Sequence, residues 1–344
     1  MIHRLLERAV EMRASDLHLT VGMPPCVRID GRLRVMPHEP TLSPAHTAGV
    51  AETILNPEQK EVFKERGEID LSFGIPELGR FRINMYRQRS SVAIAVRVIP
   101  PEILSLEELG LPEVVKGLCT KKEGLILVTG PAGSGKSTTL AAMINEINQT
   151  RQGVVVTLED PIEFLHTHGK CVINQREIGS DTRSFAEGLR SALRSDPDVI
   201  LVGEMRDPET MAIAVQAAET GHLVLSTLHT RSSAQTIDRI VDAFPPHGQQ
   251  QIRVQLAASL QAVISQRLLL RKDGQGRVLA TEVMTGIPAV RNLIREGKTH
   301  QLEQMIETSS RYGMHTLRSS VKSLIDRQLI DPRELLQLGE MVDA

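Results

Sequence analysis

One glycine-rich segment of the chain combines the residue types that bind phosphate. Residues 130–137 read GPAGSGKS and fit the pattern G-x-x-x-x-G-K-[ST], between an apolar run over 125–129 and a helical pattern over 140–144. Glycines let the backbone wrap a phosphate, so that several N–H groups point inward at the start of the helix. In this pattern Lys136 reaches the β- and γ-phosphates, and the Ser137 hydroxyl ligates Mg²⁺. The chain has no N-K-x-D tetrad for guanine, so we predict ATP rather than GTP.

Carboxylates follow two other apolar runs. Residues 157–163 (TLEDPIE) end one run with three acidic side chains, of which Glu163 is the last. The run 199–202 leads into Gly203 and Glu204, and the glycine stands where a metal-binding aspartate is usual. Ligands of open α/β sheets collect at the carboxyl ends of the strands, so both glutamates are candidates for metal coordination and water activation. How Glu163 and Glu204 divide these roles stays open.

Two histidines flank the apolar run 223–226. His222 precedes the run, and His229 follows it in the sequence TLHT. A histidine at a strand end near phosphate can sense the γ-phosphate by donating a hydrogen bond. A structural role is the default for either histidine alone. The neighbouring phosphate and carboxylate motifs favour the sensor role for His229.

The elements that position these residues read as an α/β core. Short, continuous apolar runs alternate with helical patterns, as in a mostly parallel sheet covered by helices on both faces. The runs are 125–128, 154–156, 199–202 and 223–225. We expect residues 116–270 to form this core. A hairpin around 272–276 and amphipathic helices are expected in the C-terminal region 271–344.

Residues 1–99 read as a separate, small α/β domain. A helix is predicted over 2–12 and another over 43–66. Alternating patterns, with a D-G turn between two of them, predict strands. The strands are expected at 16–19, 27–29, 33–35, 69–73, 79–85 and 92–99. Pro100-Pro101 opens a predicted linker over 100–115.

The amino-acid composition argues against several classes of function. The 344 residues carry 40 Lys and Arg against 42 Asp and Glu, a net charge of −2, and only 2% are aromatic. This balance disfavours direct nucleic-acid binding. The three cysteines form no C-x-x-C pair, which excludes a zinc knuckle. No apolar run approaches the roughly 18 to 20 residues of a membrane span, and the first residues lack a signal-peptide pattern. We expect a cytoplasmic, multidomain protein.

The motifs, in this order, resemble those of the secretion-ATPase superfamily, and most closely its PilT family of type IV pilus retraction motors. The resemblance runs from about residue 14 to 333. It rests on the phosphate loop, with Ala132 where the family usually has threonine, on the acidic box 157–163, on the segment 196–207 and on the histidine box 220–230. A fifth motif, 289–296, resembles the A-I-R-N-L-I box of retraction ATPases, with Val290 in place of isoleucine.

The resemblance implies a PAS-like N-terminal domain, a RecA-like core with a mostly parallel sheet, and a set of site residues. The implied cofactors are ATP and Mg²⁺. Nucleotide binding falls to Gly130, Gly133, Ser134, Gly135, Lys136, Ser137, Thr138 and His222. Catalysis falls to Glu204, Glu163, Lys136, His229, Arg82 and Arg97. Metal binding falls to Ser137, Glu204 and Glu163.

The resemblance also implies an assembly. Family members form homohexamers in which arginines of a neighbouring N-terminal domain complete each site, and Arg82 and Arg97 match those positions. Residues 86–89 (YRQR) are more basic than is usual in the family, so which arginine acts stays open. The implied place is the inner face of the membrane at the pilus base, reached through an inner-membrane platform protein.

The predicted function is therefore a hexameric ATPase that powers type IV pilus retraction, and hence twitching motility. One alternative is a pilus-extension or type II secretion ATPase of the same superfamily. Such proteins typically carry an extra N-terminal domain and often a four-cysteine zinc insertion. Further alternatives are a RecA-like nucleic-acid translocase and a nucleotide-binding scaffold without turnover.

Overall fold

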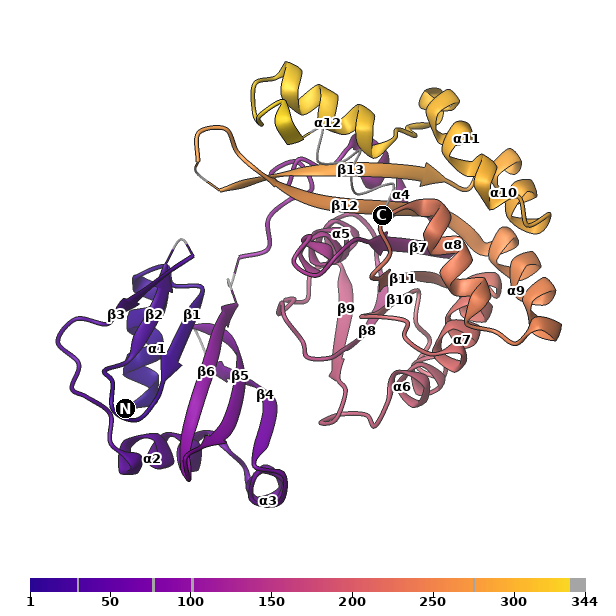
Figure 1. Cartoon of the computed structure of the whole chain (residues 1–344). Helices are drawn as coiled ribbons and strands as arrows, with labels where there is room; N and C mark the ends of the chain where they lie inside the picture. Colours follow the sequence, from indigo (N-terminus) through magenta and orange to yellow (C-terminus); the bar gives the residue numbers. More distant parts are fainter. Residues whose placement is uncertain (30, 76–77, 100–101, 275, 335–344) are drawn as a thin grey trace. The chain divides into compact units, whose positions relative to one another are not determined.

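The computed structural model describes residues 1–29, 31–75, 78–99, 102–274 and 276–334. The chain forms two compact units (Figure 1). The first contains Met1–Glu102 and also the short segment Pro161–Leu165, and the second contains Ile103–Asp160 and the described residues from His166 onward. Pro100-Pro101, where the predicted linker opens, and the last ten residues of the predicted C-terminal region lie outside the described residues.

The first unit is a six-stranded antiparallel sheet with helices on one face. Its strands, in the order β3-β2-β1-β6-β5-β4, are β1 (Asp16–Leu19), β2 (Cys26–Ile29), β3 (Arg32–Val35), β4 (Glu68–Ile75), β5 (Gly79–Gln88) and β6 (Ser91–Ile99). Its helices are α1 (Ile2–Glu11), α2 (Pro44–Ile54) and α3 (Pro57–Arg66). Apolar residues of the helices share one buried core with alternate residues of the strands, such as Phe81, Ile83 and Met85.

The single helix predicted over 43–66 is in fact two helices. Asn56 caps α3 by accepting a hydrogen bond from the Gln59 backbone, and the Gln59 side chain accepts one in return from the Asn56 backbone. Pro57 at the first helical position cannot continue α2, because proline lacks the N–H that a helix interior needs. The N-P dipeptide therefore ends one helix and begins the next.

The second unit is built on a seven-stranded sheet. In the order β13-β12-β7-β11-β10-β8-β9, its strands are β7 (Gly124–Thr129), β8 (Gly153–Glu159), β9 (Cys171–Glu177), β10 (Val199–Val202), β11 (Leu223–Leu228), β12 (Leu260–Leu270) and β13 (Arg277–Thr285). Neighbouring strands run parallel, except that β13 is antiparallel to β12. The α/β prediction with a mostly parallel core sheet is confirmed. Strand β9 has no counterpart in the sequence prediction, whereas β12 and β13 form the hairpin that is predicted around residues 272–276.

Helices cover both faces of this sheet (Figure 1). They are α4 (Glu113–Cys119), α5 (Lys136–Thr150), α6 (Phe185–Ala192), α7 (Pro208–Glu219), α8 (Ser233–Asp242), α9 (Pro246–Ser259), α10 (Pro288–Arg295), α11 (Leu302–Thr308) and α12 (Leu317–Asp326). Residues Ile126 and Val128 of β7 pack against α5, whereas Leu125 and Leu127 pack against α7 and α9. Strand β7 is thus buried on both faces, as its unbroken apolar sequence predicts. No helix in the described ranges is long and apolar enough to cross a membrane.

Candidate nucleotide site

The predicted phosphate loop connects the end of β7 to the first turn of α5. Its glycines Gly130, Gly133 and Gly135 have φ values of 144°, 75° and 88°, which residues with a side chain rarely adopt. A Cβ on Gly130 would lie 2.4 Å from the Gln266 carbonyl oxygen of β12. The loop therefore needs glycine both for its backbone conformation and for its close approach to the neighbouring strand.

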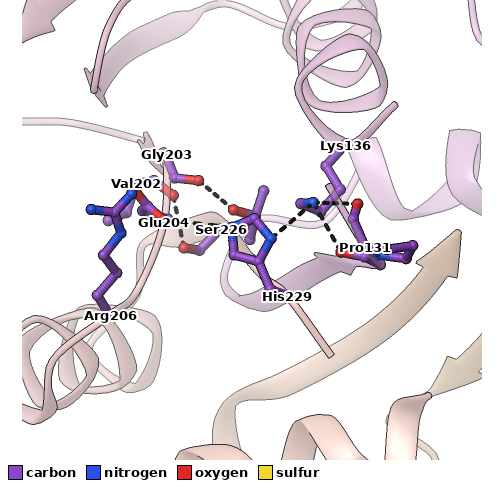
Figure 2. A network of polar contacts seen from close by, with 10 residues as sticks. Pro131, Lys136, Val202, Gly203, Glu204, Arg206, Ser226 and His229 are labelled. Atoms are coloured by element: carbon purple, nitrogen blue, oxygen red, sulfur yellow. Dashed lines mark hydrogen bonds and ion pairs between the residues drawn. The ribbon is translucent and has the colours of Figure 1, made fainter. Parts of the chain in front are cut away.

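Lys136 is folded into the loop. Only 8% of this residue is exposed, and its Nζ donates hydrogen bonds to the carbonyl oxygens of Gly130 at 2.9 Å and Pro131 at 3.0 Å. The same Nζ lies 3.5 Å from Nδ1 of His229 (Figure 2). The contacts hold a positive charge inside the loop, where the phosphates of a nucleotide would bind.

A buried hydroxyl group in the loop is available to bind a phosphate. Ser134 is 3% exposed, and its hydroxyl has no hydrogen-bond partner within the part of the chain that the structure describes. A buried hydroxyl without a partner is costly, and a phosphate oxygen would satisfy it. Ser137 is exposed and Thr138 is half-buried on the first turn of α5. The residues present therefore fit a nucleotide.

A magnesium ion fits the same place. Mg²⁺ prefers oxygen ligands and is usually held by one or two protein groups together with substrate phosphates. Ser137 and Glu204 offer such oxygen atoms. Over the described residues no group of three or more His, Cys, Asp or Glu side chains is arranged to hold a metal by itself.

The glycine in place of the usual aspartate has a steric reason. Gly203 directly follows β10, and its N–H donates to the Leu158 carbonyl of β8 at 2.8 Å. A Cβ on Gly203 would lie 3.1 Å from that carbonyl oxygen and 3.4 Å from the Cα of Glu159. The end of β8 therefore leaves little room for a side chain, and Glu204 is the first carboxylate past the strand.

Glu204 faces two basic side chains. Its Oε1 lies 2.6 Å from a guanidinium nitrogen of Arg206, and its Oε2 lies 3.7 Å from Nε2 of His229 (Figure 2). His229 thus has Glu204 on one side and Lys136 on the other. The structure brings together these three predicted residues, of which Glu204 and His229 follow β10 and β11 and Lys136 begins α5.

Two hydroxyls of β11 fix the backbone beneath Glu204. Ser226 Oγ donates to the Val202 carbonyl at 2.7 Å, and Thr227 Oγ1 donates to the Gly203 carbonyl at 2.6 Å (Figure 2). Sequence reasoning assigned no role to these side chains or to Arg206. Polar residues that interrupt an apolar strand run were the available signal, because a buried hydroxyl must find a partner.

His222 lies far from the phosphate loop. It precedes β11, next to the start of β7, since its carbonyl oxygen accepts from the Gly124 N–H at 3.0 Å. Its Nδ1 lies 3.1 Å from the Ala217 carbonyl oxygen at the end of α7. The phosphate loop follows the other end of β7, so the structure does not bring His222 to the predicted nucleotide site.

Glu163, Arg82 and Arg97 belong to the first unit. Arg82 and Arg97 lie opposite each other on the paired strands β5 and β6, and Arg97 Nε donates to an Asp16 carboxylate oxygen at 3.3 Å. Glu163 lies in the segment Pro161–Leu165. Lys136, Glu204 and His229, by contrast, all lie in the second unit.

Side chains of strand β12 contact the residues on either side of the phosphate loop. Ser265 Oγ lies 2.8 Å from Thr129 Oγ1, and Gln266 Nε2 donates to Thr139 Oγ1 of α5 at 2.7 Å. The next residue, Arg267, has a lowered pKa because of burial and because of the nearby positive charge of Arg231.

The fifth motif, 289–296, lies in helix α10 and its C-terminal cap. Arg291 points inward and donates to three carbonyl oxygens, those of Gly286 at 2.7 Å, Ala258 at 2.6 Å and Leu260 at 3.0 Å. It therefore joins the end of α9, the start of β12 and the turn before α10. Asn292 and Arg295 of the same helix are exposed.

Comparison with known proteins agrees with this arrangement. The family model described as type II/IV secretion system protein matches residues 1–329. The type IV pilus retraction ATPase PilT of Pseudomonas aeruginosa is 50% identical over 329 residues, which are 96% of this chain and 95% of that protein. The type IV pilus ATPase PilU of the same organism is 40% identical over 354 residues, covering 99% and 92%.

A solved structure shares the whole fold. The crystal structure of the pilus retraction motor PilT with bound ADP superposes with a TM-score of 0.91 at 48% identity, covering 98% of this chain and 96% of that one. The chain therefore belongs to the type II/IV secretion system protein family and, within it, to the PilT-type ATPases.

Proposed function

We propose that this chain is the ATP-hydrolysing motor that retracts type IV pili and so powers twitching motility. The observation that carries the proposal is the contact series Lys136–His229–Glu204, which joins the phosphate loop to the carboxylate past β10. The 50% identity to a pilus retraction ATPase along almost the whole chain supports the choice of filament and direction.

The position of each site residue indicates its role in nucleotide binding or hydrolysis. The phosphate loop binds the nucleotide through backbone N–H groups, and the Lys136 ammonium neutralises charge on the β- and γ-phosphates. Mg²⁺ bound by Ser137 and Glu204 would supply further charge neutralisation. Glu204 orients or deprotonates the attacking water, and Glu163 is the second candidate for metal or water. His229, between Lys136 and Glu204, senses the γ-phosphate.

The assembly extends this proposal. We expect a homohexamer in which Arg82 and Arg97 of one subunit reach the phosphates bound by its neighbour. Such arginines neutralise transition-state charge and tie hydrolysis to domain motion. The hexamer would sit at the cytoplasmic face of the inner membrane, at the pilus base, through contact with a platform protein rather than with lipid or nucleic acid.

Cells whose only copy carries Lys136→Ala test the proposal. We expect more surface pili and lost twitching motility, because retraction stops while extension continues. The matched control is Lys170→Ala, which removes an exposed lysine and should leave pili and motility unchanged. Missing pili would favour an extension motor instead. An unchanged pilus count, with ATP turnover abolished in the purified variant, would overturn the role in pili.

A further inference from the structure

The two oxygens of Glu204 have different partners. Oε1 is bound by the Arg206 guanidinium at 2.6 Å, whereas Oε2 lies 3.7 Å from His229 on the side of the phosphate loop (Figure 2). The Glu204 side chain is 12% exposed and that of Arg206 is 71% exposed. The carboxylate is thus enclosed at the site, and the guanidinium reaches it from the solvent side.

The backbone around Arg206 is fixed on both sides. Met205 is buried, and its N–H donates to the Thr227 carbonyl of β11 at 3.2 Å. Asp207 caps α7 by accepting hydrogen bonds from the backbone and the hydroxyl of Thr210, at 2.8 and 2.7 Å. Arg206 therefore extends from an anchored turn, and its guanidinium folds back onto the residue two positions earlier.

We propose that Arg206 is a positioning residue for hydrolysis, which acts by fixing the orientation of the Glu204 carboxylate. A glutamate has three rotatable side-chain bonds, and a group that activates water must be held close to its productive geometry. The ion pair at Oε1 leaves Oε2 directed toward His229 and the phosphate loop. The inference rests on the proposed role of Glu204 and requires no contact between Arg206 and the nucleotide.

The chain contains a matched ion pair with no such task. Arg190 contacts Glu209 at 2.5 Å, and both of these side chains are half exposed, at 50% and 59%. Exposed pairs of this kind contribute little to stability or function. Arg190→Ala is therefore the control for loss of an arginine from an ion pair in the same unit.

The test is steady-state ATP hydrolysis with ATP binding measured separately. For Arg206→Ala we expect kcat to fall about ten-fold, since the ion pair that orients the Glu204 carboxylate is lost, while ATP affinity changes less than about two-fold. Arg206→Lys should recover part of kcat, and Arg190→Ala should leave it unchanged. A kcat for Arg206→Ala equal to that of Arg190→Ala would overturn the inference, as would a fall in kcat matched by an equal loss of ATP binding.

A second comparison shows whether Arg206 acts through Glu204. In a single-turnover assay, Arg206→Ala should have no further effect in a Glu204→Gln background, because the group that it positions is already inactive. An equal ten-fold loss in both backgrounds would refute action through Glu204. Normal hydrolysis by Glu204→Gln alone would refute the role of Glu204 and this inference together, but it would leave the pilus assay of Lys136→Ala as an independent test of retraction.

Discussion

Replacing Arg291 by alanine removes a side chain that joins three parts of the second unit. Its guanidinium donates to the carbonyl oxygens of Gly286, Ala258 and Leu260. The bonds to Gly286 and Leu260 are partly buried, whereas the bond to Ala258 is exposed and water can replace it. Hydrogen bonds that involve a charged group contribute about 1.5–3 kcal/mol each, so two partly buried bonds at the lower limit give about 3 kcal/mol.

Arg295→Ala is the matched control on the same helix. Arg295 is exposed, and its contact with the Asn292 side chain is long, at 3.4 Å. Loss of an exposed side chain of this kind changes the free energy of unfolding by less than about 0.5 kcal/mol. Both variants belong to the motif 289–296, so the comparison separates a side chain bonded to neighbouring backbone from an exposed one.

The measurement is denaturant unfolding of the two variants and of the unmodified chain. We expect Arg291→Ala to lower the free energy of unfolding of the second unit by about 3 kcal/mol, with Arg295→Ala indistinguishable from the unmodified chain. A loss below about 1 kcal/mol for Arg291→Ala would refute a stabilising role of the Arg291 hydrogen bonds, because water would then satisfy the three carbonyl oxygens equally well. If Arg291→Ala does lose about 3 kcal/mol, a retraction defect of this variant is explained by lost structure rather than by a lost contact with a partner.

Two further predictions address the shared site and the pH dependence. Mixed hexamers of Arg82→Ala and Lys136→Ala chains should recover part of the ATP turnover that each variant lacks, since some sites then combine an intact loop with an intact neighbouring arginine; no recovery in hexamers shown to be mixed would contradict catalysis in trans. Burial lowers the pKa of His166 to about 4, below its unfolded value of about 6.5, so the unfolded state binds more protons between these values and stability should fall as the pH drops from about 6.5 toward 4. His166→Gln should reduce this fall in unfolding midpoints measured at pH 7 and pH 5, and equal falls would rule out His166 as its source.

The phosphate loop could be predicted from sequence because its residues are contiguous. The strand, the glycine turn and the helix that it needs follow one another within residues 124–150, and the structure shows all three there. Glu204 and His229 were also predicted separately as residues at strand ends. Their contact follows from the order of the strands, because β10 and β11 are neighbours and both end at the edge where β7 meets the loop.

The histidine box alone does not predict on which side of the sheet edge His222 lies. It shares the histidine box with His229, but it precedes β11, and the six residues of the strand separate the two histidines. Ligands of parallel sheets bind at the carboxyl ends of the strands, so its position before the strand was a signal against a role in nucleotide binding.

The hairpin around residues 272–276 is predicted, but the extent of its first strand, β12, and the pairing of that strand with β7 are not. Ser265 and Gln266 interrupt its apolar sequence, although they are 1% exposed, because their side chains bond to Thr129 and Thr139 around the phosphate loop. A buried strand with polar side chains does not show the continuous apolar run by which the other core strands were identified. Its polar residues have partners far away in the sequence, which local patterns do not reveal.

The course of β12 has a mechanical consequence. Arg291 holds the carbonyl of Leu260 at the start of the strand, and Gln266 grips helix α5 beside the phosphate loop, six residues further on. At about 3.3 Å per residue the two points are about 20 Å apart along the chain. Strands β7 and β13 brace β12 from both sides, so it resists stretching. A force applied at α10 would therefore be transmitted to the phosphate loop along the backbone of β12, from Leu260 to Gln266.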